Sequence, residues 1–227
     1  GVVKMERKII HVVGTGTIGE PLIGLLCDFQ DQLGIDEITF HKYSALNSDH
    51  SKVVGLIKRG GRLCVDSNKV DDFKALDLDP DFETEEAIKR ATVVIDCTPR
   101  GIGHKNKEKY YHKFMKGGKG FLAQGSESGF GKKYARKIND ATLNSDDQFI
   151  QIVSCNTHNL CCITHTLALD GDHDNLEEGR FVCIRRANDI SQSGSFIPSP
   201  QVGSHGSPKY GTHHAEDAAG LFHTMDI

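Results

Sequence analysis

The sequence predicts an α/β protein: a Rossmann-type doubly wound parallel sheet, followed by the beginning of an α+β catalytic domain. Short apolar runs alternate with segments of helical periodicity, a glycine-rich turn follows the first run, and the alternation stops after Asp170. Alternating strands and helices imply parallel βαβ units, because two parallel strands need a crossover between them. We therefore expect a dinucleotide-binding domain over residues 1–154 and a partial catalytic domain over residues 155–227.

Short apolar runs predict the strands, since strands of a covered parallel sheet are apolar on both faces. The run ATVVIDC is typical of a central strand. The predicted strands cover residues 7–13, 37–42, 62–65, 91–97, 120–124 and 149–154.

Segments with apolar residues at helical spacing predict the helices. One of them ends at Gly60-Gly61, because glycine favours a helix stop. The predicted helices run from the glycine turn to about Phe29 and over residues 49–59, 83–90, 105–116, about 156–169 and 213–225. In the C-terminal part we expect a polar loop over 171–179, a strand over 180–186 and a Gly/Ser/Pro-rich loop over 187–212.

Composition and charge exclude several classes of protein. The 227 residues suffice for one to two domains, and 37% of them are hydrophobic, as in soluble globular proteins. A formal net charge of −4 argues against a nucleic-acid partner, and no run approaches the ~18 apolar residues of a membrane span. The seven cysteines are an odd number without a secretion signal, so we expect reduced thiols in a cytoplasmic protein.

The turn GTGTIG at residues 14–19 follows the first strand and precedes the first helix, the context that a G-x-G-x-x-G nucleotide motif requires. Gly14 allows the tight turn, Gly16 lets the backbone approach a pyrophosphate, and Gly19 permits close packing of helix on strand. The helix N-terminus then supplies N–H groups and a positive dipole end. The alternative is a glycine turn without a ligand.

The end of the second strand normally distinguishes NAD from NADP. An acid there binds the ribose 2′-hydroxyl of NAD, whereas this chain has Phe40-His41-Lys42-Tyr43 and no acid. Lys42 therefore favours NADP, or tolerance of both cofactors, unless it merely faces solvent.

The stretch IVSCNTHNLCC at 152–162 has three cysteines, which suggest a metal site, a redox pair, core packing or a nucleophile. A metal is not favoured, because no second C-x₂₋₄-C pair follows, and the redox C-x-x-C spacing is absent. Cys155 lies where a strand ends and a helix begins, where N–H groups favour a thiolate and can bind an oxyanion. Packing is the interpretation for the other cysteines: Cys27, Cys64, Cys97, Cys161, Cys162 and Cys183.

Together these motifs resemble the archaeal-type (type II) phosphorylating glyceraldehyde-3-phosphate dehydrogenases. The most specific are VIDCTP-x-GIG-x-KN and VSCNT-x-x-LC. The matching stretches follow the family's order: GTGTIG (14–19), VVIDCTPRGIGHKN (93–106), AQGSES (123–128), IVSCNTHNLC (152–161), IRRAND (184–189) and THHAED (212–217). The resemblance implies NAD(P)-dependent oxidation of glyceraldehyde 3-phosphate to 1,3-bisphosphoglycerate, and the reverse, in glycolysis or gluconeogenesis by a homotetramer.

The resemblance also implies roles for individual residues. Cys155 would form a thiohemiacetal and then a thioester, with Asn156 beside it at the catalytic centre. The implied cofactor contacts are Gly14, Gly16, Thr17, Ile18, Gly19, Lys42, Thr98, Gly125, Ser126 and Arg185. The implied contacts to substrate or inorganic phosphate are Ser154, Cys155, Asn156, Arg186, His213 and His214. Without the resemblance, the arginine pair reads equally as a solvated strand edge and the histidine pair as a helix cap.

The sequence departs from the family's pattern at its end. The family's catalytic histidine belongs to a segment resembling L-M-H-x-H, and the chain ends at Ile227 without it. We therefore expect either a C-terminally incomplete chain or a degenerate member. The competing functions are a related aldehyde or acyl-phosphate reductase, such as an aspartate-semialdehyde dehydrogenase, and a dinucleotide-binding fragment without catalysis.

Overall fold

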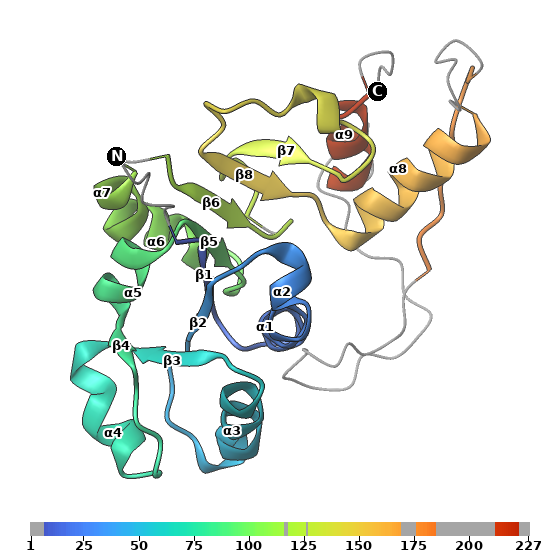
Figure 1. Cartoon of the computed structure of the whole chain (residues 1–227). Coiled ribbons are helices and arrows are strands. Elements are labelled where there is room, and N and C mark those ends of the chain that lie inside the picture. The colour runs from blue at the N-terminus through green and yellow to red at the C-terminus, as the bar shows by residue number, and fades with distance from the viewer. Residues whose placement is uncertain (1–6, 116–117, 126, 169–175, 185–211, 223–227) are drawn as a thin grey trace. The chain divides into compact units, whose positions relative to one another are not determined.

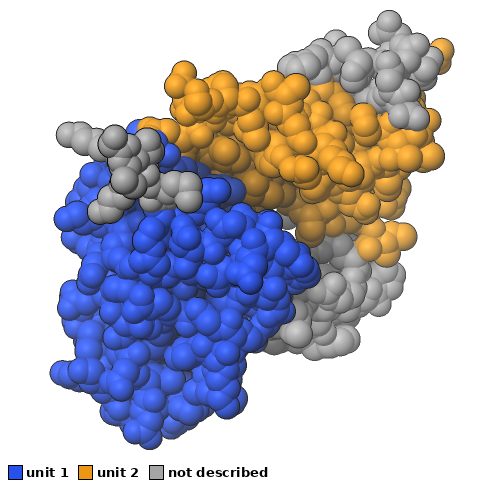
Figure 2. Space-filling model, viewed as in Figure 1, with its two compact units in different colours: residues 1–123 blue, residues 124–227 orange. Residues whose placement is uncertain are grey.

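The computed structural model describes residues 7–115, 118–125, 127–168, 176–184 and 212–222 (Figure 1). The chain divides into two compact units, residues 1–123 and 124–227, which Figure 2 shows in different colours. These units do not test the domain boundary expected at residue 154, which stays a prediction.

The first unit is built on a parallel sheet of short strands. Its strand order is β4-β3-β2-β1-β5-β6, so the chain leaves β1 on one side and returns to its other side at β5. That reversal of direction makes the β1/β5 boundary a topological switch point, the place where ligands bind in such sheets. The strands are β1 (Ile9–Val13), β2 (Glu37–His41), β3 (Arg62–Val65), β4 (Phe82–Glu83), β5 (Val93–Asp96) and β6 (Gly120–Ala123).

Helices lie on both sides of this sheet, with α1 and α3 on one side and α5 and α6 on the other (Figure 1). Val12, Ile23, Phe40 and Leu56 belong to the core under α1 and α3. The α-helices of the unit are α1 (Gly19–Asp28), α2 (Gln30–Leu33), α3 (His50–Lys58), α4 (Val70–Lys74), α5 (Thr84–Arg90), α6 (Ile102–Asn106) and α7 (His112–Phe114). Short 3₁₀ turns precede α3 and α4, η1 (Asn47–Asp49) and η2 (Ser67–Lys69), and a π turn, η3 (Lys107–Tyr111), joins α6 to α7. The predicted doubly wound α/β fold is confirmed.

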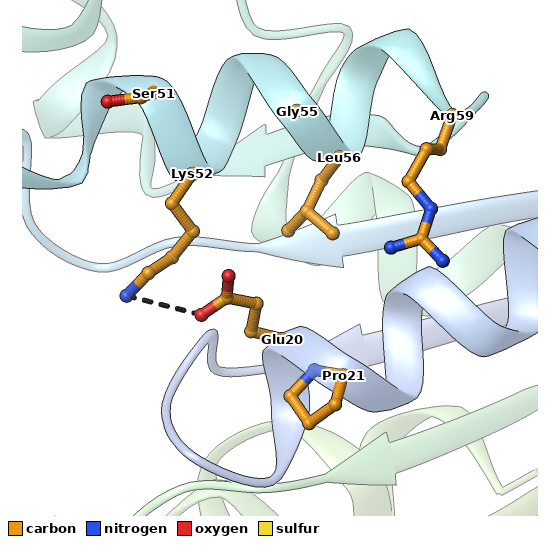
Figure 3. Close-up of a pocket in the computed structure, with 7 residues that line it drawn as sticks. All are labelled: Glu20, Pro21, Ser51, Lys52, Gly55, Leu56 and Arg59. Carbon is orange, nitrogen blue, oxygen red and sulfur yellow. Dashed lines mark ion pairs between the residues drawn. The ribbon is translucent and has the colours of Figure 1, made fainter. Parts of the chain in front are cut away.

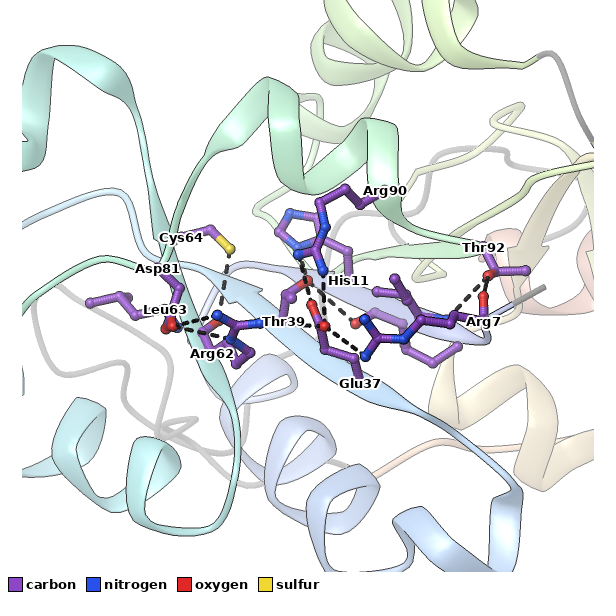
Figure 4. A network of polar contacts seen from close by, with 12 residues as sticks. Arg7, His11, Glu37, Thr39, Arg62, Leu63, Cys64, Asp81, Arg90 and Thr92 are labelled. Atoms are coloured by element: carbon purple, nitrogen blue, oxygen red, sulfur yellow. Dashed lines mark hydrogen bonds and ion pairs between the residues drawn. The ribbon is translucent and has the colours of Figure 1, made fainter. Parts of the chain in front are cut away.

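At the amino end of the sheet a buried carboxylate is paired with three arginines (Figure 4). Glu37 lies 2.8 Å from Arg90, 3.1 Å from Arg7 and 3.4 Å from Arg62. Burial alone would raise the pKa of Glu37, but these ion pairs hold it below its usual range. Since ligands of such sheets bind at the opposite edge, this network is structural.

The second unit pairs β8 (Phe149–Ile152) with β7 (Lys132–Tyr134) in parallel. A 3₁₀ turn, η4 (Asp140–Thr142), lies between these strands in sequence, and helices α8 (Cys155–Leu167) and α9 (His213–Ala219) complete the described part. Its core holds Val153, Cys161, Ala218, Leu221 and Phe222. An ion pair of 2.6 Å between Lys133 Nζ and Asp217 Oδ1 fastens α9 to β7.

The predicted strand over 180–186 is wrong for the residues that are described. Residues 180–184 are irregular, and Val182 and Ile184 are 87% and 91% exposed. A short apolar run forms a strand only where a ladder partner is present, and no described strand pairs with residues 180–184. The predicted helix over 213–225 is shorter, because α9 ends at Ala219.

Other sequence predictions fall partly or wholly outside the description. These are the loop over 187–211, most of the loop over 171–179, and the three site residues Ser126, Arg185 and Arg186. Within the described ranges, no helix combines the length and apolar character that a bilayer span needs.

Candidate functional site

The glycine turn lies at the carboxyl end of β1, beside the topological switch point. Gly14 has a φ of +97°, which an L side chain rarely adopts, and its N–H donates to the carbonyl of His41 over 3.2 Å. A Cβ on Gly19 would lie 2.0 Å from the carbonyl oxygen of Gly14, so helix α1 can pack this closely only with glycine there. A Cβ on Gly16 would meet nothing within 4 Å.

These backbone positions are the ones that the three predicted glycine roles require. Gly14 turns the chain, Gly19 allows contact, and Gly16 faces open space where another molecule can approach. Thr17 and Ile18 follow on the exposed side of the turn. Binding of a dinucleotide there stays a prediction.

A buried carboxylate holds the neighbouring loop after β5. Asp96 accepts hydrogen bonds from the backbone N–H of Thr98 at 3.0 Å, from Asn106 Nδ2 at 2.9 Å and from the Tyr111 hydroxyl at 2.6 Å; the Thr98 hydroxyl donates to it as well. Burial, followed by the Asp96 charge, raises the pKa of Tyr111, which keeps the phenol protonated as a donor. The π turn before α7 places Tyr111 for this bond.

The loop after β5 also contacts the glycine turn itself. The N–H of Cys97 donates to the carbonyl of Val13 over 2.8 Å, and a Cβ on Gly14 would lie 3.3 Å from the Cys97 carbonyl oxygen. Asp96 therefore fixes Thr98, a predicted cofactor contact, beside the glycine turn. Sequence reasoning missed Asp96, although an acid at the end of an apolar strand is a signal that could have found it.

The Lys42 side chain is buried and paired. Only 10% of it is exposed, and its Nζ lies 2.8 Å from Asp49 Oδ2. The alternative of a lysine that merely faces solvent is therefore wrong. Asp49 was not among the predicted residues, because it follows seven positions later and reaches Lys42 only through the fold.

Cys155 is the first residue of α8, immediately after the segment that leaves β8. Ser154 is the N-cap in extended backbone conformation, and its Oγ accepts a hydrogen bond from the N–H of Thr157 over 3.3 Å. The side chain of Cys155 is exposed. The predicted strand-to-helix junction is thus observed, with the thiol accessible and Asn156 in the first turn.

The remaining cysteines of α8 differ from one another. Cys161 is fully buried in the core of the second unit, and burial raises the pKa of its thiol to about 12. Cys162 is exposed, so its predicted packing role is wrong: it points about 100° away from Cys161 around the helix, and this direction lies outside the buried face of α8. Packing is also wrong for Cys183, which is exposed, whereas Cys27, Cys64 and Cys97 are buried as predicted.

Gly125 lies directly against the backbone that precedes Cys155. A Cβ on Gly125 would lie 2.3 Å from the backbone nitrogen of Ser154, so a larger residue would displace the N-cap. The buried Gln151 side chain accepts from the N–H of Gly129 at 3.0 Å and donates to the Gly125 carbonyl at 3.4 Å. Gly125, a predicted cofactor contact, thus also has a packing role at the thiol.

His213 and His214 begin helix α9, with their ring centroids 4.0 Å apart. Thr212 is the N-cap residue of this helix, and its Oγ1 lies 2.9 Å from Nδ1 of His214. The two histidines therefore lie at the start of a helix, as expected if they form a helix cap rather than a phosphate site. Among the residues that the structure describes, no three His, Cys, Asp or Glu side chains are placed to hold a metal ion.

The sheet with its switch point and glycine turn defines a Rossmann-like α/β fold. Comparison with curated proteins finds relatives that share one enzyme name. The chain is 26% identical to a protein named glyceraldehyde-3-phosphate dehydrogenase from Pyrobaculum arsenaticum, over 96% of this chain and 60% of that protein. Proteins of the same name from Methanobrevibacter smithii and Methanothermus fervidus are 26% and 27% identical, over 97% and 92% of this chain.

The chain spans about three-fifths of the length of these relatives, 58–61% for the three proteins named. No protein-family model matches it. The resemblance to archaeal glyceraldehyde-3-phosphate dehydrogenases is confirmed at low sequence identity over nearly the whole chain.

Proposed function

We propose that this chain provides the dinucleotide site and the nucleophile of an NAD(P)-dependent phosphorylating glyceraldehyde-3-phosphate dehydrogenase. The observation that carries the proposal is the exposed Cys155 at the start of a capped, 13-residue helix. The relatives' shared name supports the choice of substrate. The same resemblance supports a cytoplasmic homotetramer, which light scattering of the purified protein would test.

The residues around the glycine turn fit a dinucleotide. The open space at Gly16 leaves room for a pyrophosphate against the backbone, and helix α1 begins there with its positive dipole end. Gly14, Thr17, Ile18 and Gly19 would form the cradle. A bound NAD(P) would supply the hydride acceptor of the reaction.

The thiol would form the covalent bond to substrate. The Cys155 thiolate adds to the aldehyde carbon, and the resulting oxyanion can be bound by N–H groups at the start of α8. Loss of hydride from that carbon leaves a thioester. Inorganic phosphate then attacks the thioester carbonyl, and the C–S bond breaks to give an acyl phosphate and the free thiolate.

Other polar residues have proposed supporting roles in this scheme. Ser154 and Asn156 would line the substrate position, and His213 with His214 would bind a phosphate group. Gly125, Ser126, Thr98 and Arg185 would contact the dinucleotide, and Arg186 the substrate phosphate. We give the role of general base to no residue of this chain, because the resemblance places it in an L-M-H-x-H segment.

A pair of serine variants on one helix tests the nucleophile. Cys155→Ser should abolish formation of the acyl-enzyme, detected as a mass increase after exposure to glyceraldehyde 3-phosphate and NAD(P). Cys162→Ser, which changes another exposed thiol on the same helix, should leave that mass increase intact. Acylation that survives in Cys155→Ser, or disappears only in Cys162→Ser, would overturn the assignment.

The glycine turn beside the switch point also fits a second candidate, a dinucleotide-binding unit without turnover. Calorimetric titration with NAD and NADP, paired with a phosphate-dependent assay of the same sample, separates the two. Binding together with turnover supports the dehydrogenase, whereas binding alone supports the second candidate. Turnover without phosphate dependence would instead indicate another aldehyde dehydrogenase.

A further inference from the structure

Four charged side chains form a cluster where β2 ends and α3 begins. The carboxylate of Asp49 lies between two lysines, 2.8 Å from Lys42 Nζ and 3.3 Å from Lys52 Nζ. Lys52 also lies 3.6 Å from Glu20, the second residue of α1. The cluster therefore brings two cations and two anions together at the strand end that normally selects the cofactor.

Lys52 connects this cluster to the glycine turn. Its Nζ is 3.5 Å from the carbonyl oxygen of Thr15, which lies between Gly14 and Gly16. Figure 3 shows Lys52 reaching across to Glu20 over a cavity between α1 and α3. That cavity has a volume of about 300 Å³ and is lined by polar as well as apolar residues, among them Ser51 and Leu56.

The structure thus corrects a premise of the cofactor argument. The sequence has no acid at the tip of the second strand, and this absence favoured NADP. In the folded chain an acid nevertheless lies at that strand end, because the η1 turn brings Asp49 into contact with Lys42. The hydrogen bond from Lys42, against the opposing effect of burial, lowers the pKa of Asp49, so this acid is ionised at neutral pH.

An ionised carboxylate and a phosphate compete for the same ammonium groups. A ribose 2′-hydroxyl can donate to the carboxylate, as the acid of NAD-selective folds accepts it. A 2′-phosphate instead needs cations and is repelled by a neighbouring anion. With Asp49 in place, both lysines already have a partner, and a phosphate must displace it.

We propose that Asp49 determines the choice between the two dinucleotides: its carboxylate binds the 2′-hydroxyl of NAD and withholds Lys42 and Lys52 from the 2′-phosphate of NADP. The inference rests on the proposed dinucleotide site and deepens it. When a 2′-phosphate displaces Asp49, Lys52 acts as a second phosphate-binding cation beside Lys42.

Removal of the charge on Asp49 tests this inference by direct binding. Asp49→Asn should bind NADP about tenfold more tightly and NAD about tenfold more weakly, measured by calorimetry at one fixed ionic strength. Lys52→Met should weaken NADP by a similar factor and change NAD little. Glu20→Gln is the matched control: it removes an equal charge 3.6 Å from Lys52 without touching Lys42, and should change the NADP-to-NAD ratio less than Asp49→Asn does.

The outcomes separate this inference from the proposed function. If the unaltered chain binds neither dinucleotide, the dinucleotide site itself is wrong and the inference falls with it. If the unaltered chain binds, but neither Asp49→Asn nor Lys52→Met changes the ratio, only the inference is overturned. Should Asp49→Asn fail to fold, as judged by circular dichroism, the Lys52→Met result alone supports or overturns it.

Discussion

A fully buried histidine in the central strand predicts how stability depends on pH. His11 of β1 has its Nδ1 2.7 Å from the Thr39 hydroxyl, and its Nε2 has no hydrogen-bond partner among the described residues (Figure 4). Burial, and secondarily the charge of nearby His41, lowers the pKa of His11 from 6.5 to about 3. The folded protein therefore holds a neutral imidazole at pH values where the unfolded chain binds a proton.

The size of the effect follows from this pKa difference. Above pH 6.5 both states are neutral at His11, and its contribution to the free energy of unfolding is fully present. Below pH 6.5 the unfolded state gains a proton, and stability falls by about 1.4 kcal/mol per pH unit until about pH 3. Between pH 7.5 and pH 5.0 the loss from this residue is about 2 kcal/mol.

Urea unfolding, followed by far-ultraviolet circular dichroism at pH 7.5 and pH 5.0, measures this loss. In His11→Asn the amide retains a polar atom near the position of Nδ1 but does not titrate. Between pH 7.5 and pH 5.0 the free energy of unfolding should fall by about 2 kcal/mol less in the variant than in the unaltered chain. Any destabilisation by the substitution that does not depend on pH cancels in this comparison. An equal loss in both proteins would refute the buried neutral histidine, and a second variant, His11→Phe, should agree with the first.

Three glycine substitutions test local geometry, and a fourth substitution tests an ion pair. Gly19→Ala should destabilise the fold by about 1–3 kcal/mol through its backbone clash, whereas Gly16→Ala should preserve thermal unfolding and weaken dinucleotide binding in calorimetry. Gly125→Ala should displace Ser154 and slow the labelling of the exposed Cys155 thiol by iodoacetamide, as measured by mass spectrometry. A hydrogen bond from His41 lowers the pKa of Asp66 from 3.8 to about 2, so its stabilisation is present above pH 4 and lost toward pH 2. Asp66→Asn should cost about 1–2 kcal/mol at pH 7, measured by urea unfolding, and clearly less at pH 2, where about half of Asp66 is protonated.

The main strands of the fold were predictable because their apolar character is local. β1, β2, β3, β5, β6 and β8 all lie inside predicted ranges, since a covered parallel strand must be apolar whatever its neighbours. β4 and β7 were not predicted: they have two and three residues, Phe82–Glu83 and Lys132–Tyr134, and carry no pattern of their own. Such short edge strands form because they hydrogen-bond to the neighbouring strand, which is β3 for β4 and β8 for β7.

The glycine turn was equally predictable, because the positive φ at Gly14 and the close helix packing at Gly19 both require glycine within six residues. The cysteines show the limit of such local reasoning. Cys161 and Cys162 are equivalent in composition and hydropathy, yet one is buried and the other exposed, because only one face of α8 packs. Neighbouring residues of one helix can both be buried, as Ala87 and Ile88 of α5 are, so the sequence alone does not tell which of the two cysteines packs.

Lys42 is a case where local reasoning was incomplete. The sequence identifies a lysine at the strand tip, and general rules then assign it to a phosphate. What the side chain can bind depends on the charge already beside it, and that charge comes from Asp49, which the η1 turn returns to the tip at 2.8 Å. A residue-by-residue rule cannot include this partner, since the same lysine with an asparagine at position 49 would offer an unpaired cation. If the proposed dinucleotide site is correct, the cofactor preference depends on the Lys42–Asp49 pair. Replacing Lys42 should then favour NAD, and replacing Asp49 should favour NADP.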